Sequence, residues 1–180
     1  YCHPEYPCDL FSYGSCVTGL ITPFSDMDLC IKRQPRVPKA QINPFLAAMV
    51  PRLSEIPGVL TVKHIDTAAV PIIKLTAAIG SGQPTHIDLS VEAAEDEEGK
   101  STAFRTTQFV CDCITAYPSF RPVILFLKYA LNLAGLSDTY KGGLNAYGLC
   151  VLYLAFLRIK RLQNSTNVGR LTRDFLRFLT

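Results

Sequence analysis

The sequence lacks several features that would assign the protein to a particular class. It has no apolar run long enough to cross a bilayer and no signal-peptide pattern, so we expect no membrane partner. No internal repeat is visible, and no stretch is of low enough complexity to indicate a long disordered region. The net charge is only +3, so charge by itself does not indicate a nucleic-acid partner.

What is present supports a folded core. Hydrophobic residues make up 48% of the 180 residues, and a chain of this length forms one or two small domains. The seven cysteines are odd in number and irregularly spaced, which favours free, largely buried thiols. A zinc site of Cys2, His3 and Cys8 would lack a fourth ligand and the usual spacing.

Two aspartates, Asp26 and Asp28, stand at the start of an apolar segment that reads as a buried strand. Residues two apart on a strand share a face, so the two carboxylates project together while their apolar neighbours turn into the core. A later segment, 85–91, repeats the pattern with Asp88 on its polar face. Two neighbouring strands of this kind can bring the three carboxylates together.

Three carboxylates at such close range repel one another unless cations lie among them. Mg²⁺ or Mn²⁺ suits them, because such ions take oxygen ligands and complete their shell with water and substrate phosphates. Two ions can clamp the attacking and leaving oxygens of an in-line displacement. The pattern of Asp26, Asp28 and Asp88 therefore predicts a two-metal site for nucleotidyl transfer.

A Gly-Ser pair precedes the first two aspartates. The short segment 8–13 reads as a strand, after which Gly14 permits a tight turn with close backbone approach. Ser15 would open a short helix, whose backbone N–H groups are suited to phosphate. Each motif is weak when taken singly, but the ordered set, followed by Asp88, is far less expected by chance.

The segment 11–29, FSYGSCVTGLITPFSDMDL, resembles the signature of the DNA polymerase β-like nucleotidyltransferases. Within them it is most similar to the non-canonical poly(A) polymerases and terminal uridylyltransferases of the DNA polymerase σ-like branch. Segment 69–74 resembles the family strand before the third carboxylate, 85–92 resembles that carboxylate strand, and 140–147 looks like the helical central domain. The resemblance covers residues 7–180, nearly the whole chain.

The resemblance implies an α+β fold in which a mixed-sheet nucleotidyltransferase lobe is followed by a helical poly(A)-polymerase-type central domain. The expected catalytic domain is 1–100, and 101–180 is the expected helical central and poly(A)-polymerase-associated part, which is partial. Strands are expected at 59–65, 70–77 and 85–91; helices at 41–55 (broken or kinked by Pro51), from Ala103, at 144–162 and at 168–179; and a solvated acidic loop at 92–100.

The same resemblance implies roles for the matching residues. Asp26, Asp28 and Asp88 would be the catalytic, metal-binding carboxylates, with Asp88 helping to activate the 3′-hydroxyl of the primer. The triphosphate would contact Gly14 and Ser15.

Three further residues would complete nucleotide binding by the same resemblance. Lys128 would bind phosphate and Tyr147 would stack on the base. Thr102 lies nearest to the family's ribose-binding asparagine.

The chain departs from the family pattern in a few places. A second phosphate-binding lysine is replaced by Asn132, and the serine pair before the stacking tyrosine is replaced by Asn145 and Ala146. The chain starts almost at the catalytic strand and stops soon after 168, so it looks like a fragment or a much reduced member. The loop that helps to select adenine or uracil is expected beyond it.

Plainer roles also fit some of these residues. Lys128 can pack its stem on an apolar helix with its ammonium in water, and Tyr147 can belong to the core. His86 fits a solvated or structural histidine better than a general base. The arginines of the last two predicted helices form either a solvated face or a path for RNA.

We therefore expect a template-independent RNA nucleotidyltransferase that adds AMP from ATP to RNA 3′ ends. The alternatives are a terminal uridylyltransferase, a catalytically inert nucleotide- or RNA-binding pseudoenzyme, and an enzyme that makes short or cyclic oligonucleotides without a primer. The expected partners are the RNA 3′ end and a nucleoside triphosphate. The resembled branch further suggests a zinc-knuckle RNA-binding protein, a helicase and a nuclear location, with the cytoplasm as the alternative.

Overall fold

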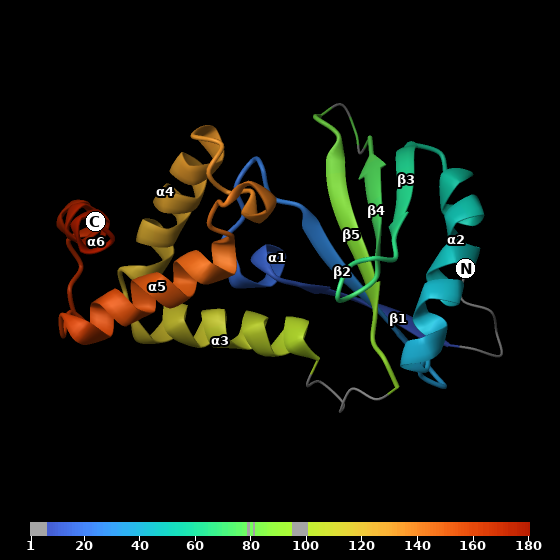
Figure 1. Ribbon diagram of the computed structural model, residues 1–180, viewed down its shortest axis with the longest axis horizontal. Helices are drawn as coiled ribbons and strands as arrows, with labels where there is room; N and C mark the ends of the chain where they lie inside the picture. The colour runs from blue at the N-terminus through green and yellow to red at the C-terminus, as the bar shows by residue number, and fades with distance from the viewer. Residues whose placement is uncertain (1–6, 79, 81, 95–100) are drawn as a thin grey trace. The chain divides into compact units, whose positions relative to one another are not determined.

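The computed structural model describes residues 7–78, 80, 82–94 and 101–180. It divides into two compact units. The first comprises Tyr1–Val17 with Ser25–Arg105, and the second comprises Thr18–Phe24 with Thr106–Thr180. Figure 1 shows the strands and helix α2 of the first unit and the longer helices of the second. The predicted α+β class is confirmed.

The first unit is built on a five-stranded mixed sheet with the order β1-β2-β5-β4-β3. Strands β2 and β5 run parallel to each other, and the remaining neighbours are antiparallel. The strands predicted at 59–65 and 85–91 are confirmed, and the one predicted at 70–77 begins two residues later. The strands are β1 (Cys8–Tyr13), β2 (Met27–Arg33), β3 (Val59–Ile65), β4 (Ile72–Ala77) and β5 (Thr85–Val91).

Alternation along the strands gives the sheet one apolar face. This face forms a core with helix α2 (Ile42–Ser54), in which Leu46 and Ile73 are fully buried. Because successive strand residues point to opposite faces, the aspartates of β2 and β5 lie on the other face. Burial of the apolar face thus fixes which side of the sheet carries the carboxylates.

The helix predicted at 41–55 is confirmed as α2, and it runs through Pro51, so of the predicted break or kink at this residue the break is wrong. A proline inside a helix removes one backbone donor, here toward the carbonyl of Ala47. Ala47 is exposed, so water can satisfy that carbonyl. A short 3₁₀ turn, η1 (Lys39–Gln41), leads into the helix.

Glu92 is a second departure from the sequence analysis. It was expected to start a solvated acidic loop, but it is 3% exposed and directly extends the sheet, since its N–H donates to the carbonyl of Ile31 at 2.9 Å. Its carboxylate lies 3.7 Å from Arg36 and 4.0 Å from Lys32. These cations compensate for its burial. Residues 95–100 of the predicted loop lie outside the described residues.

Most cysteines are as predicted. Cys30, Cys113 and Cys150 are buried free thiols, and burial raises the pKa of Cys150 to about 12, which keeps it protonated and unreactive. Cys8 is disulfide-bonded, so the free-thiol prediction is wrong there. Cys8 lies on the outer strand β1 and is only partly buried.

The second unit is helical. Phe120, Tyr153, Phe156 and Phe175 pack with ring centroids between 5.3 and 5.9 Å apart and lie at the centre of its core. In the described part of the chain, none of the helices is both long and apolar enough to span a membrane. The helices are α3 (Thr102–Ala116), α4 (Phe120–Leu133), η2 (Thr139–Lys141), α5 (Ala146–Ile159) and α6 (Val168–Phe178).

Gly142, Gly143 and Leu144 lie in the connection between α4 and α5. A Cβ on Gly143 would collide with the backbone of Leu136 and of Asp138, because the chain folds back tightly there. The N–H of Gly143 donates to the carbonyl of Asp138 at 2.8 Å, and Leu144 donates to Leu136, also at 2.8 Å. A glycine at this position is therefore a packing requirement.

Tyr153 and Ser119 provide a test of the helical core. The Tyr153 hydroxyl donates to the Ser119 hydroxyl at 3.1 Å, and both residues are at most 1% exposed. We expect Tyr153→Phe and Ser119→Ala each to lower the free energy of unfolding by about 1–2 kcal/mol, because each change leaves the other buried hydroxyl without its hydrogen-bond partner. Urea denaturation measures both.

The double variant is the matched control. If the bond is what stabilises the pair, Tyr153→Phe with Ser119→Ala costs less than the sum of the single changes, by roughly 1 kcal/mol. Strictly additive losses would contradict a coupled hydrogen bond.

Candidate active site

The backbone register places two of the predicted carboxylates side by side. In the parallel pairing of β2 with β5, Asp28 is the direct partner of Asp88. Asp26 lies just before β2, and its side chain is 40% exposed, against 18% for Asp88. The expectation that neighbouring strands carry the aspartates is confirmed for Asp28 and Asp88, whereas Asp26 lies outside the strand.

A lysine joins this group, and the sequence analysis gave it no role. The ammonium of Lys74 in β4 donates to both carboxylate oxygens of Asp88, at 2.8 and 2.9 Å. The same nitrogen lies 3.7 Å from Oδ2 of Asp26. One cation thus contacts two of the three predicted metal ligands.

The environment keeps Lys74 charged. Burial acts most strongly and lowers the pKa of the amine, but the hydrogen bond and charge of Asp88, with the charge of Asp26, together raise the pKa above its ordinary value. The ammonium is therefore retained throughout the neutral range. The carboxylates hold a positive charge among them by the mechanism that would also attract a metal.

The donor set fits a hard divalent cation, since three carboxylates offer only oxygen ligands. Within the residues that the structure describes, however, no three acidic, histidine or cysteine side chains are gathered closely enough to hold a metal ion. The contacts of Lys74 with Asp88 and Asp26 account for part of this, because they direct oxygens toward the ammonium. In this conformation the aspartates share one face without surrounding a common point.

The Gly14-Ser15 turn lies against the same group. Gly14 has φ 63°, and a Cβ there would collide with the carboxylate of Asp28. Helix α1 (Ser15–Thr18) begins at Ser15, as predicted, and is one turn long, with Val17 N–H donating to the Gly14 carbonyl at 3.2 Å. Glycine is needed here both for the left-handed backbone and for the close approach to Asp28.

Tyr13 supports the group from β1. It pairs in register with Asp28, and its hydroxyl lies 3.4 Å from the hydroxyl of Ser90, which donates to the Leu29 carbonyl at 3.1 Å. Burial raises the pKa of the Tyr13 phenol, and the charges of Asp28 and Asp88 raise it further. The phenol therefore remains neutral beside the carboxylates.

Lys128 lies in the second unit. Its ammonium donates to the Leu20 carbonyl at 2.9 Å, and Arg121 donates to the Thr18 carbonyl at 3.3 Å. These two cations of α4 attach the segment Thr18–Phe24 to the helices. The structure thus gives Lys128 a structural contact, and its predicted phosphate role stays a prediction.

Three other residues from the sequence analysis have defined places. Tyr147 is 44% exposed, its ring packs edge-on against Phe109 with the centroids 6.0 Å apart, and its predicted stacking role stays a prediction. Asn145 caps α5, accepting from the N–H of Gly148 at 2.7 Å. Thr102 is exposed at the first position of α3.

Asn132 stands where some family members have a second lysine. Its side chain forms hydrogen bonds at the C-terminal end of α4. Its amide donates to the Lys128 carbonyl at 2.9 Å and accepts from Ser137 at 3.0 Å. His86 is exposed and its Nδ1 lies 3.3 Å from the Thr76 hydroxyl. This contact agrees with a structural role for His86.

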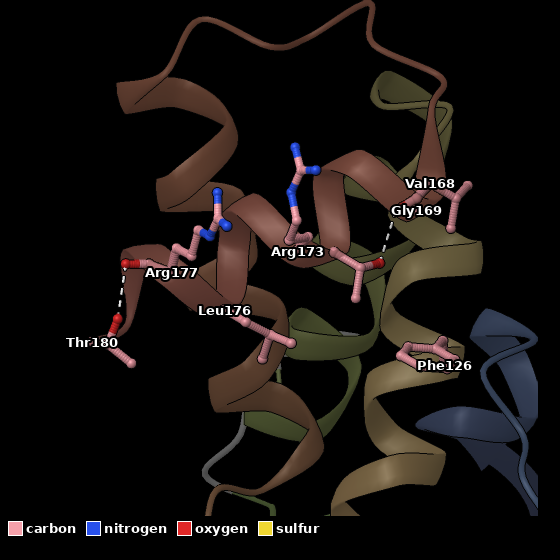
Figure 2. Close-up of a pocket in the computed structure, with 8 residues that line it drawn as sticks. Phe126, Val168, Gly169, Arg173, Leu176, Arg177 and Thr180 are labelled. Carbon is pink, nitrogen blue, oxygen red and sulfur yellow. Dashed lines mark hydrogen bonds between the residues drawn. The ribbon is translucent and has the colours of Figure 1, made fainter.

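The second unit also contains a groove of about 630 Å³ that the sequence analysis did not predict (Figure 2). Phe126 of α4 faces residues of α6, among them Leu176, and the apolar stems of Arg173 and Arg177 border it. Arg173 and Arg170 also pair with Asp174, at 3.0 and 3.5 Å. The arginines of α6 are thus partly neutralised, which weakens the case for a uniformly basic RNA path.

Comparison with known proteins gives a consistent result. Residues 3–123 match the family model described as the central palm domain of poly(A) RNA polymerase, mitochondrial-like. The chain is 27% identical over 173 residues to the poly(A) RNA polymerase cid14 of Schizosaccharomyces pombe, covering 93% of this chain and 24% of cid14. It is 26% identical over 152 residues to the terminal uridylyltransferase cid1 of the same organism, covering 83% of this chain and 34% of cid1.

Among solved structures, the chain is similar to the polymerase core of TRAMP, an RNA surveillance complex. The TM-score is 0.74 at 25% identity, covering 93% of this chain and 50% of that one. The chain therefore spans about a quarter to a half of the length of the proteins that it matches here.

The Gly14 turn yields a stability test. We expect Gly14→Ala to cost about 1–2 kcal/mol for the left-handed backbone and a further loss, because the new methyl displaces the Asp28 carboxylate. Gly80→Ala is the matched control: its φ is 68°, in the same region, and its Cβ would meet nothing within 4 Å. Equal losses in thermal unfolding would show that closeness to Asp28 is unimportant.

Proposed function

The chain belongs to the family of mitochondrial-like poly(A) RNA polymerase central palm domains, and on that premise we propose that it is the catalytic part of a template-independent RNA nucleotidyltransferase. The observation that carries the proposal is the register pairing of Asp28 with Asp88 beside Asp26, with the Gly14 turn against Asp28. Two parallel strands bring two carboxylates to one side of the sheet, and the glycine turn lies against one of them.

The three aspartates have separate tasks in the proposed reaction. Asp26 and Asp28 would hold the metal ions on the triphosphate side, and Asp88 would help to hold an ion on the primer side and favour deprotonation of the RNA 3′-hydroxyl. When bound, two Mg²⁺ or Mn²⁺ ions supply charge neutralisation for the attacking and leaving oxygens. The 3′-oxygen forms a bond to the α-phosphorus, and the bond to pyrophosphate breaks.

In the proposed reaction the protein forms no covalent bond with the substrate. Its contribution is to position the reacting groups and to stabilise developing negative charge. The short turn at Gly14 and Ser15 is proposed to contact the triphosphate, because its backbone N–H groups lie at the start of α1. Replacement of Asp26 or Asp28 would remove a negative charge from this group and leave the fold intact.

Further nucleotide contacts are proposed for three residues. In the second unit, Lys128 is proposed to bind phosphate and Tyr147 to stack on the base, which its half-exposed ring allows; such stacking is worth roughly 1–3 kcal/mol. Thr102 of α3 is proposed for the ribose. These assignments rest on the family resemblance and on the accessibility of the side chains.

The proposed substrate is ATP, added as AMP to RNA 3′ ends. The name of cid14 supports a poly(A) polymerase, and the name of cid1 supports uridylyl transfer as the second candidate. Because the chain matches only part of each relative, its substrates and partners are proposals. A zinc-knuckle RNA-binding protein, a helicase and a nuclear location are proposed on the family resemblance, with a cytoplasmic location as the alternative. The likeness to the polymerase core of an RNA surveillance complex supports partner proteins in general.

Primer extension tests the proposal. A labelled oligo(A) RNA is incubated with Mg²⁺ and each of the four ribonucleoside triphosphates in turn. We expect extension with ATP, and a loss of roughly a thousandfold or more in Asp26→Ala and Asp28→Ala, since each removes charge stabilisation from the transition state.

Asp66→Ala is the control for charge removal. Asp66 is an exposed aspartate of the same unit, placed after β3 and outside the carboxylate group. The Asp66→Ala variant should retain primer extension.

Extension mainly with UTP would identify a uridylyltransferase. Extension that persists in both Asp26→Ala and Asp28→Ala with metal present would refute the two-metal assignment.

A further inference from the structure

Lys74 has no task in the proposed reaction, yet its contacts dominate the carboxylate group. Its nitrogen lies within hydrogen-bond distance of both oxygens of Asp88 and 3.7 Å from Asp26. A divalent ion at Asp88 needs at least one of those oxygens. Ammonium and metal therefore compete for the same electron pairs.

The backbone of Lys74 is held in the sheet, while its side chain can rotate toward solvent. Its backbone lies in β4, in register with Lys63 on β3 and with Asp88 on β5. Pairing on both sides holds the Cα atom, so the ammonium can leave Asp88 only by rotation of the side chain. That side chain is 48% exposed, which leaves it room to turn toward solvent.

The contact between Lys74 and Asp88 balances negative charge among the three aspartates. Asp26, Asp28 and Asp88 carry three negative charges on one side of the sheet, and like charges at close range destabilise one another. The ammonium of Lys74 cancels one of them and lies between two of the aspartates. It keeps the group together when no other cation is present.

We propose that Lys74 is an internal counter-ion of the candidate metal site, which holds Asp26 and Asp88 in the metal-free protein and must release Asp88 before a divalent cation binds there. Lys74 is a positioning residue, because it acts through the two aspartates. The inference rests on the proposed function, since it takes these carboxylates as the metal ligands.

Metal binding without turnover tests the inference. Free Mn²⁺ is measured by electron paramagnetic resonance as the chain is titrated, with neither nucleotide nor RNA present. In Lys74→Met we expect the apparent Kd for Mn²⁺ to fall roughly tenfold, because the competing cation is gone from a partly exposed site. Without metal, the same variant should melt a few degrees lower, since repulsion between the aspartates is then uncompensated.

Two further variants separate charge from other effects. Lys63→Met removes the same charge from the neighbouring strand, where Lys63 is exposed and forms no ion pair with the described aspartates; it should leave the Mn²⁺ affinity within about twofold of the parent. Lys74→Arg keeps a cation at the site and should restore most of the parent affinity. If Lys74→Met does not fold, Lys74→Gln replaces it, with the same tightening expected.

The outcomes decide the inference independently of the proposed function. Unchanged or weaker Mn²⁺ binding in folded Lys74→Met overturns the counter-ion role while leaving primer extension as the test of the enzyme. An equal fall in the apparent Kd for Mn²⁺ in Lys63→Met also overturns the counter-ion role, because the lower net charge of the protein would then explain the effect. If the parent chain binds no Mn²⁺ even at high concentration, the metal assignment falls and the inference falls with it.

Discussion

The pairing of Asp28 with Asp88 on parallel strands is the constraint around which the first unit is arranged. Parallel register forces the two carboxylates to be immediate neighbours, a costly arrangement unless charge nearby is balanced. Lys74 supplies a cation from β4, and Gly14 leaves space for the Asp28 carboxylate. The register also cannot slip, because a shift of one residue would turn the aspartates into the apolar core with α2.

The second unit depends on packing. Its centre is a set of interlocking aromatic rings around Tyr153, whose hydroxyl donates to the buried Ser119. Cations of α4 reach the carbonyls of Thr18 and Leu20, so a segment that follows the Gly14 turn in sequence is attached to the helices. The segment Thr18–Phe24, which connects the Gly14 turn to β2 in sequence, is therefore part of the helical unit.

Much of the fold could be predicted because its signals are local. Alternation at 59–65 and 85–91 gave the bounds of two strands, and the left-handed turn at Gly14 followed from residue type. The errors arise where tertiary surroundings override a local rule. Pro51 stays within a helix since water can reach the carbonyl that it leaves unpaired, and Glu92 is buried because Arg36 and Lys32 approach it from other parts of the chain.

The sequence by itself determined the chemistry that is available: three aspartates at strand spacing, a glycine turn before them and an apolar face opposite, each set by residue type and periodicity. Only the tertiary structure decided that Lys74 stands beside Asp88. That contact depends on the register of β4 against β5, which the intervening connection sets and residue spacing does not reveal. It likewise decided that Lys128 donates to Leu20, because a carbonyl becomes a partner only when folding brings a distant segment within reach.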